Sequence, residues 1–193
     1  NLRLSYSSGF RAPQAFDEDM HIENVGGTVA MIERAKDLKE EKSQSFSVSA
    51  DMYHRFGAFQ TNLLIEGFYT RLTDVFVLGK PYDRGDGILV KTRSNGPGAK
   101  VMGLTLEGKV AYLSILQIQA GLTLQRSRYD EPHKWHDDAP AEKKIFRTPD
   151  TYGYFTATCT PIKPLSIALS GTYTGRMLVQ RMDITAENAE LGK

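Results

Sequence analysis

A strict two-residue alternation runs through Ser45-Phe46-Ser47-Val48-Ser49-Ala50-Asp51-Met52. Successive side chains of a β-strand point to opposite faces, so this stretch predicts a strand with one apolar and one polar face. Residues 116–125 repeat the pattern, with aliphatic residues opposing Gln, Gly and Thr. Alternation sustained over two separate stretches is typical of a β-sheet that has one polar side.

The same period recurs along the whole chain. Four further segments show it clearly, namely residues 2–6, 63–69, 102–112 and 165–173. The segment 152–160 is ambiguous, because Tyr152, Tyr154 and Phe155 place aromatic rings on both faces. Six clear strands and one ambiguous strand predict an all-β protein.

Composition excludes several classes of protein. The 193 residues carry 24 Lys and Arg against 23 Asp and Glu, so the basic excess of a nucleic-acid-binding surface is missing. One cysteine, Cys159, allows neither an internal disulfide framework nor a four-cysteine zinc site. The longest uncharged run, residues 110–125, is shorter than the roughly 20 apolar residues of a spanning helix. Because the sequence starts at Asn1 without an initiator Met, we expect a segment of a longer protein.

Two all-β architectures fit this alternation. Uninterrupted alternation over about 9–12 residues exceeds the usual strand and matches a tilted membrane strand of roughly 9–11 residues. Short connections at residues 56–58, 113–114 and 161–164 alternate with long ones at 8–42, 79–87 and 128–149. An antiparallel up-and-down meander in a transmembrane β-barrel places all short turns at one end. The alternative is a soluble β-sandwich or small barrel that binds carbohydrate or protein.

The segment Asn95-Gly96-Pro97-Gly98 has two interpretations. It has the composition of a hairpin turn, and a turn here would break the order of short and long connections. A kink or bulge within one long strand, residues 88–112, preserves that order. We therefore interpret it as a kink.

Three local patterns resemble one known family. They are Leu4-Ser5-Tyr6-Ser7-Ser8-Gly9-Phe10-Arg11-Ala12-Pro13, then Asp37-Leu38-Lys39-Glu40-Glu41-Lys42-Ser43, then Arg93-Ser94-Asn95-Gly96 followed by Val101-Met102-Gly103-Leu104-Thr105-Leu106-Glu107. In order and separation they resemble the C-terminal part of the barrel of a TonB-dependent outer-membrane receptor. Two positions depart from the family pattern, because Glu40 replaces the usual Pro and Thr105 stands near the usual Glu.

The resemblance implies a fold and a function. The family barrel has approximately 22 strands around a plugged lumen. Residues 1–193 would form about seven of those strands, a partial transmembrane β-barrel without the plug domain and the last strands. The intact protein is expected to import a siderophore–metal chelate, vitamin B12 or an oligosaccharide across a bacterial outer membrane. Implied partners are its own plug domain, the TonB energy-transducing complex, the large solute and the lipid bilayer.

Candidate site residues fall into two groups. The cluster His133-Lys134-Trp135-His136-Asp137-Asp138 would lie in a cell-exterior loop, where Trp135, His133, His136 and Asp137 are candidates for binding the solute. Two histidines beside carboxylates could also ligate a metal, but no third ligand follows at a regular spacing, so no metal site is predicted. The residues expected to face the lumen and the plug are Ser47, Ser49, Glu107, Gln117 and Gln119.

Other segments point to no catalysis, cofactor or nucleic-acid partner. The chain has no Gly-x-Ser-x-Gly elbow and no His-Glu-x-x-His, and Cys159 reads as a packing residue, so no enzyme is predicted. Residues 83–87 read as a tight polar turn in place of a calcium loop. Apolar residues in 29–42 are spaced too irregularly to predict a helix firmly. Seven strands would leave two open edges, so the chain alone is expected to self-associate.

Overall fold

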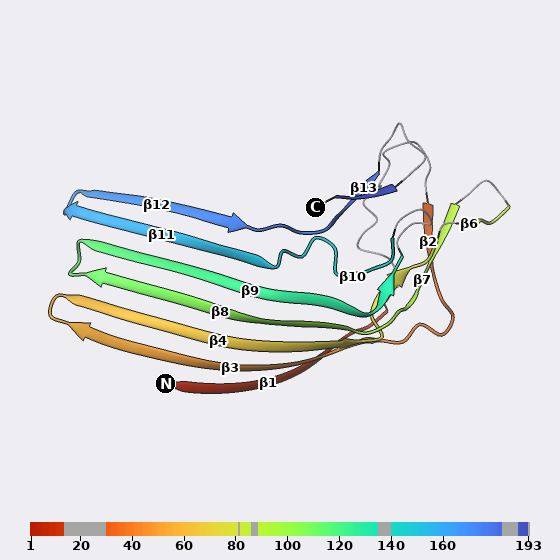
Figure 1. The fold of residues 1–193 in the computed structure, drawn as a ribbon, viewed down its shortest axis with the longest axis horizontal. Coiled ribbons are helices and arrows are strands. Elements are labelled where there is room, and N and C mark those ends of the chain that lie inside the picture. Colours follow the sequence, from red (N-terminus) through yellow and green to blue (C-terminus); the bar gives the residue numbers. More distant parts are fainter. Residues whose placement is uncertain (14–29, 81, 86–88, 135–139, 183–188, 193) are drawn as a thin grey trace.

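The computed structural model describes residues 1–13, 30–80, 82–85, 89–134, 140–182 and 189–192. Its main sheet follows a path of seven antiparallel strands in chain order, with β10 beside β9 (Figure 1). The seven strands of the path are β1 (Leu2–Arg11), β3 (Glu41–Phe56), β4 (Phe59–Thr73), β8 (Ala99–Tyr112), β9 (Leu116–His133), β11 (Thr151–Ile162) and β12 (Leu165–Thr174), and the strand off the path is β10 (Glu142–Lys144). The predicted seven-stranded meander is confirmed. Within the described ranges, no helix has the length and apolarity needed to cross a membrane.

All short turns lie at one end of the sheet, on the left of Figure 1. Phe56 pairs with Phe59 across a two-residue turn, and Gly57 has a φ of 57°. Such a positive φ matches the right-handed strand twist in tight hairpins and favours glycine. Residues 113–115 join β8 to β9, and residues 163–164 join β11 to β12. The longer connections lie at the opposite end, so the predicted alternation of short and long connections is confirmed.

The strands are longer than the alternation predicts. β3 has 16 residues, β4 has 15 and β9 has 18. At the loop end, charged residues such as Arg71 and Arg126 take over the face that is apolar nearer the turns. Hydrogen bonding between strands continues through them, because the ladder depends on the backbone and not on side-chain polarity.

The kink at residues 96–98 preserves the register of the long hairpin. Leu72 lies opposite Ala99, and four residues further along each strand Phe76 lies opposite Asn95. β5 (Phe76–Leu78) and β7 (Leu89–Asn95) therefore continue the hairpin of β4 and β8 past the irregularity. The segment is a kink, as interpreted from the sequence.

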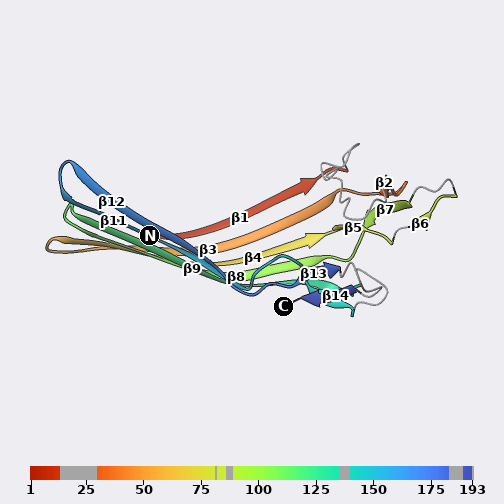
Figure 2. The same cartoon turned by 90° about the horizontal axis from the view of Figure 1, so that it is seen from above.

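Beyond the kink the hairpin joins a second, smaller sheet at the loop end (Figure 2). β7 pairs in parallel with β2 (Ala30–Arg34) and antiparallel with β5 and β6 (Tyr82–Asp83). Residues 30–34 are thus a strand, and no helix forms in the described part of 29–42. A third pairing joins β13 (Val179–Met182) to β14 (Ala189–Gly192).

The register gathers the apolar residues on one face of the main sheet. Leu104 lies opposite Leu124, and their exposed fractions are 48% and 49%. On the other face Ser49 and Thr123 are only 8% and 6% exposed. No described element covers the apolar face, whereas a β-sandwich would bury it against a second sheet. This arrangement favours the predicted barrel wall over the alternative sandwich.

The register also resolves the ambiguous strand. Phe155 lies opposite Ala120 on the apolar face, together with Cys159 opposite Leu116. Tyr154 lies opposite Gly121 on the polar face. Tyr154 and Phe155 of β11 therefore point to opposite sides of the sheet.

Aromatic residues border the apolar face at two heights. Near the turns, the rings of Phe59 and Tyr112 have centroids 4.7 Å apart. Near the loop end, Tyr6 and Phe46 are also 4.7 Å apart, and Tyr69 lies opposite Phe46. Phe59 and Tyr69 are ten residues apart on β4, which corresponds to a height of about 24 Å for a strand tilted by about 45°. This height agrees with the roughly 25 Å apolar band of transmembrane barrels.

The open edges give a prediction for residues 1–193 expressed alone. β1 and β12 form the two ends of the strand path, and the apolar face stays exposed. We expect the isolated chain to form large, heterogeneous assemblies in detergent-free buffer, because open strand edges and apolar patches both associate. Size-exclusion chromatography with light scattering measures this. A monodisperse monomer without detergent would contradict the prediction.

Candidate functional site on the polar face and at the loop end

A hydrogen-bonded cluster ties three strands together on the polar face. The Gln119 side-chain amide donates to Glu107 Oε1 at 2.8 Å and to the Tyr154 hydroxyl at 2.9 Å. These residues come from β9, β8 and β11 respectively. The cluster leaves carboxylate and hydroxyl groups directed away from the apolar face, where they can bind a polar partner.

A glycine creates the space for this cluster. A Cβ atom added to Gly121 would lie 2.5 Å from Cε1 of Tyr154, so the ring rests directly against the glycine. Gly103 does the same for Phe68, whose Cζ would be 2.6 Å from the added Cβ. Glycines that admit a neighbouring aromatic ring are a known device for fixing register in curved sheets.

Further polar groups extend across the same face. Hydroxyl pairs join neighbouring strands, with Oγ1 of Thr105 and Thr123 3.0 Å apart. The Asn62 amide donates to the Asp51 carboxylate between β3 and β4. Glu66 lies opposite Ser49 and Thr105, so a third carboxylate belongs to this surface.

The five residues expected to face the lumen all lie on this polar face. Glu107 and Gln119 are in direct contact. Ser47 lies opposite Phe68, and Ser49 lies opposite Glu66. Gln117 lies opposite Ala111 and Thr158. Sequence reasoning missed Tyr154, because the pattern of β11 assigned neither face to it.

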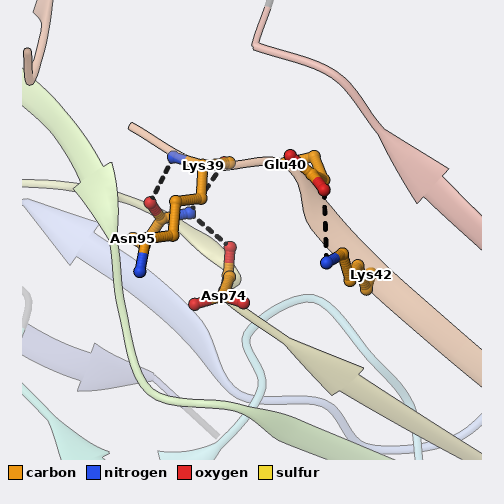
Figure 3. A network of polar contacts seen from close by, with 5 residues as sticks. All are labelled: Lys39, Glu40, Lys42, Asp74 and Asn95. Carbon is orange, nitrogen blue, oxygen red and sulfur yellow. Dashed lines mark hydrogen bonds and ion pairs between the residues drawn. The ribbon is translucent and has the colours of Figure 1, made fainter. Parts of the chain in front are cut away.

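Asn95 organises the loop end (Figure 3). Its side chain accepts from the Lys39 backbone amide at 2.7 Å and donates to the Lys39 carbonyl at 3.0 Å. It also donates to the carbonyl of Asp74 at 2.8 Å, where the backbone has a φ of 55°. One side chain therefore joins the approach to β3 with the link between β4 and β5.

Glu40, which replaces the usual proline of the family pattern, lies beside this connection. Its carboxylate is 3.2 Å from Lys42 Nζ (Figure 3). A hydrogen bond from its own backbone amide, together with Lys42, lowers the pKa of the Glu40 carboxyl below its usual range. Proline has no backbone amide hydrogen, so the proline that is usual at this position in the family pattern could not donate such a hydrogen bond.

The candidate solute-binding residues are only partly described. His133 ends β9 opposite Glu142, half-exposed, with its ring centroid 5.9 Å from that of Tyr129. Trp135, His136 and Asp137 lie outside the described residues. Within the described part of the chain, no three His, Cys, Asp or Glu side chains form a group suited to a metal ion.

The polar turn predicted for residues 83–87 is described only up to residue 85, because residues 86 and 87 lie outside the described residues. The Gly85 amide donates to Asp83 Oδ1 at 2.8 Å, and Gly85 has a φ of 98°. A side-chain oxygen that accepts from an amide two residues later is the usual Asx turn.

The packing of Tyr154 on Gly121 gives a stability prediction for the full-length protein. Gly121→Val would displace the ring and break its bond to Gln119, so we expect a loss of about 1–3 kcal/mol, as for overpacked sites. Gly108→Val is the matched control, because no heavy atom lies within 4 Å of an added Cβ there. The temperature at which heat-modifiable electrophoretic mobility is lost should fall only for the first variant. An equal fall in this temperature for both variants, or no fall in either, would contradict the packing argument.

The Asn95 contacts predict local opening in a variant. Asn95→Ala removes three hydrogen bonds, two of them exposed, and should cost about 1–2 kcal/mol locally. Hydrogen exchange at the Lys39 amide should then accelerate about tenfold, since 1.4 kcal/mol is a factor of ten. Asn95→Asp keeps the acceptor for that amide and should show a smaller increase. Unchanged exchange in Asn95→Ala would show that the contacts do not hold this loop.

Comparisons with known proteins agree with this architecture. The family described as "TonB dependent receptor-like, beta-barrel" matches residues 1–181. Among solved structures, the chain is similar to the FrpB iron transporter from Neisseria meningitidis (F3-3 variant), with a TM-score of 0.57 and 15% sequence identity. That alignment covers 92% of this chain and 25% of the transporter, so the chain spans about a quarter of its length. The search of curated proteins returns no match.

The structural likeness, at this low identity, supports the fold. The family match extends over nearly all of the chain and includes the three patterns noted in the sequence. The departures at Glu40 and Thr105 fall inside the matched residues and do not prevent the match. The chain belongs to the TonB-dependent receptor-like β-barrel family.

Proposed function

We propose that the full-length protein is an outer-membrane receptor that imports a large, scarce solute with energy supplied through TonB. The observation that carries the proposal is family membership together with an exposed apolar face bounded by two aromatic girdles. The solute classes are a siderophore–metal chelate, vitamin B12 or an oligosaccharide. The solved protein to which the chain is similar is an iron transporter, which favours the chelate among these classes.

In this proposal the polar face lines the lumen and contacts the plug domain. Ser47, Ser49, Glu107, Gln117 and Gln119 lie on the more enclosed side of the sheet. Polar side chains there exchange hydrogen bonds with water and with a plug that moves during transport. A strongly apolar lumen would instead seal against the plug and resist that movement.

The loop end is the proposed site of solute capture. The long connections and the second sheet lie at this end (Figures 1 and 2). Trp135, His136 and Asp137 belong to the connection that follows β9, and His133 is the last residue of that strand. An aromatic ring with imidazole and carboxylate groups can contact the organic part of a chelate or a sugar ring. Solute binding would then be transmitted to the plug, which the TonB complex rearranges.

The proposal predicts a growth and uptake phenotype in the parent bacterium. Deleting the gene of the full-length protein should abolish uptake of one solute class, tested with radiolabelled iron chelates, cobalamin and oligosaccharides. A protonophore should abolish the same uptake in the wild type, because the energy comes from the inner membrane. The wild-type protein should sediment with the outer membrane and need detergent for extraction. Recovery of the full-length product in the cytosolic fraction would overturn the proposal.

The loop candidates predict a change in affinity. Trp135→Ala and His133→Ala should each raise the solute Kd, by about tenfold for the tryptophan if it fills a solute pocket. His54→Ala is the matched control, because His54 packs beside Phe56 near the turn end with ring centroids 4.0 Å apart. In isothermal titration calorimetry, the solute Kd of His54→Ala should equal that of the wild type. Wild-type affinity in both loop variants would remove these residues from the proposed site.

A further inference from the structure

Basic side chains gather on the apolar side of the sheet just beyond the aromatic girdle of the loop end. Arg71, Lys100 and Arg128 lie side by side on β4, β8 and β9, because Arg71 pairs with Lys100 and Lys100 pairs with Arg128. They share their face with Tyr69 and Met102, which stand two residues nearer the turns. This row therefore lies at the height where a membrane passes from hydrocarbon to headgroups.

A fourth cation stands one step closer to the hydrocarbon. Arg126 lies opposite Met102 and is exposed. We name Arg71, Lys100, Arg126 and Arg128 the basic row. Its members come from three neighbouring strands of one ladder, so the backbone register sets their spacing.

One carboxylate partly balances the basic row. Asp130 Oδ2 is 2.8 Å from Arg71 Nη2, and Asp130 Oδ1 is 3.9 Å from Lys100 Nζ. The Asp130 amide also donates to the carbonyl of Gly98 at 2.9 Å, which fixes its backbone beside the kink. Asp150 lines an adjoining groove together with Arg126, but its carboxylate pairs with Lys144 Nζ at 2.6 Å. Among these described groups the basic row therefore keeps an excess of three positive charges, with Arg71 and Lys100 oriented by the Asp130 carboxylate.

An apolar groove adjoins the basic row. It measures about 770 Å³ and lies mainly between β3, β4, β8 and β9. Its outward lining includes Val48, Gly67, Tyr69, Leu104, Leu124 and, at one end, Arg126. Gly67 lines the groove without a side chain that would occupy it. A Cβ atom added there would have only Val48 Cγ1 within 4 Å, at 3.8 Å, so a larger side chain would extend into the open groove.

We propose that the groove and the basic row together form a binding site for a phosphorylated, acylated lipid of the surrounding membrane. Arginine and lysine bind the phosphate, and arginine does so with two parallel hydrogen bonds. One acyl chain lies in the groove over Gly67. The lipid is favoured over a protein partner, because the groove lies within the apolar band and the cations lie at its border. The inference rests on the proposed membrane position of the barrel.

The test uses the full-length protein purified in a neutral maltoside detergent. Native mass spectrometry measures binding of dioleoyl phosphatidic acid and of dioleoylglycerol, which has the same acyl chains without the phosphate. We expect phosphatidic acid to bind at least tenfold more tightly and to weaken as ammonium acetate concentration rises, because the attraction is between charges. Equal affinities for the two lipids would overturn the proposal. Competition by millimolar inorganic phosphate alone would also overturn it, in favour of a free-anion site.

Variants separate the two halves of the site. The double variant Lys100→Gln/Arg126→Gln should lose about tenfold in affinity for phosphatidic acid and change little for dioleoylglycerol. Gly67→Leu should weaken both lipids, because its side chain fills the groove. Lys163→Gln removes a positive charge far from the site, in the turn between β11 and β12, and this control should bind both lipids as the wild type does. Wild-type affinity of the double variant for phosphatidic acid would overturn the proposal.

Fractionation keeps this inference distinct from the proposed function. All variants are tested for sedimentation with the outer membrane and for solute uptake. If the wild-type protein resides in the outer membrane and imports solute but binds phosphatidic acid and dioleoylglycerol equally, only the lipid site is overturned. A wild-type protein absent from the outer-membrane fraction overturns the proposed function itself.

Discussion

The hydrogen-bonded ladder between neighbouring strands is the constraint on which the other features depend. In hydrocarbon no water can pair with an exposed backbone amide or carbonyl, so a spanning strand must satisfy them with its neighbours. Each long strand from β3 to β11 lies between two partners in an antiparallel register. A slip of one residue would turn every apolar side chain to the polar face. The ladder therefore fixes both the wall and the sidedness of its surfaces.

Local packing helps to hold that register. Tyr154 rests against Gly121 and Phe68 against Gly103, so each ring fits only where the opposing residue lacks a side chain. At the loop end Asn95 binds the Lys39 backbone through both its donor and its acceptor. These contacts differ in chemistry, but each joins residues that are distant in sequence and adjacent in the sheet.

The same register assigns the two faces to different proposed partners. On the polar face, Gln119 connects Glu107 and Tyr154 and leaves a surface suited to a hydrated plug. On the apolar face, the aromatic girdles are followed at the loop end by Arg71, Lys100 and their neighbours. In the proposed membrane position, hydrocarbon, interface and loops follow one another along each strand. The proposed transport role belongs to the polar face, and the proposed lipid-binding role belongs to the apolar face.

The amino-acid sequence alone determined the seven strands, the short turns and the sides of Ser47, Ser49, Glu107, Gln117 and Gln119, because period and turn chemistry are local properties. Only the tertiary structure decided that Tyr154 lies on the polar face, since its side follows from pairing with Gly121. It also decided that β2 pairs in parallel with β7, and that Arg71, Lys100 and Arg128 form one row. These features join residues far apart in the chain, and their positions follow from the register between strands, which no single segment encodes.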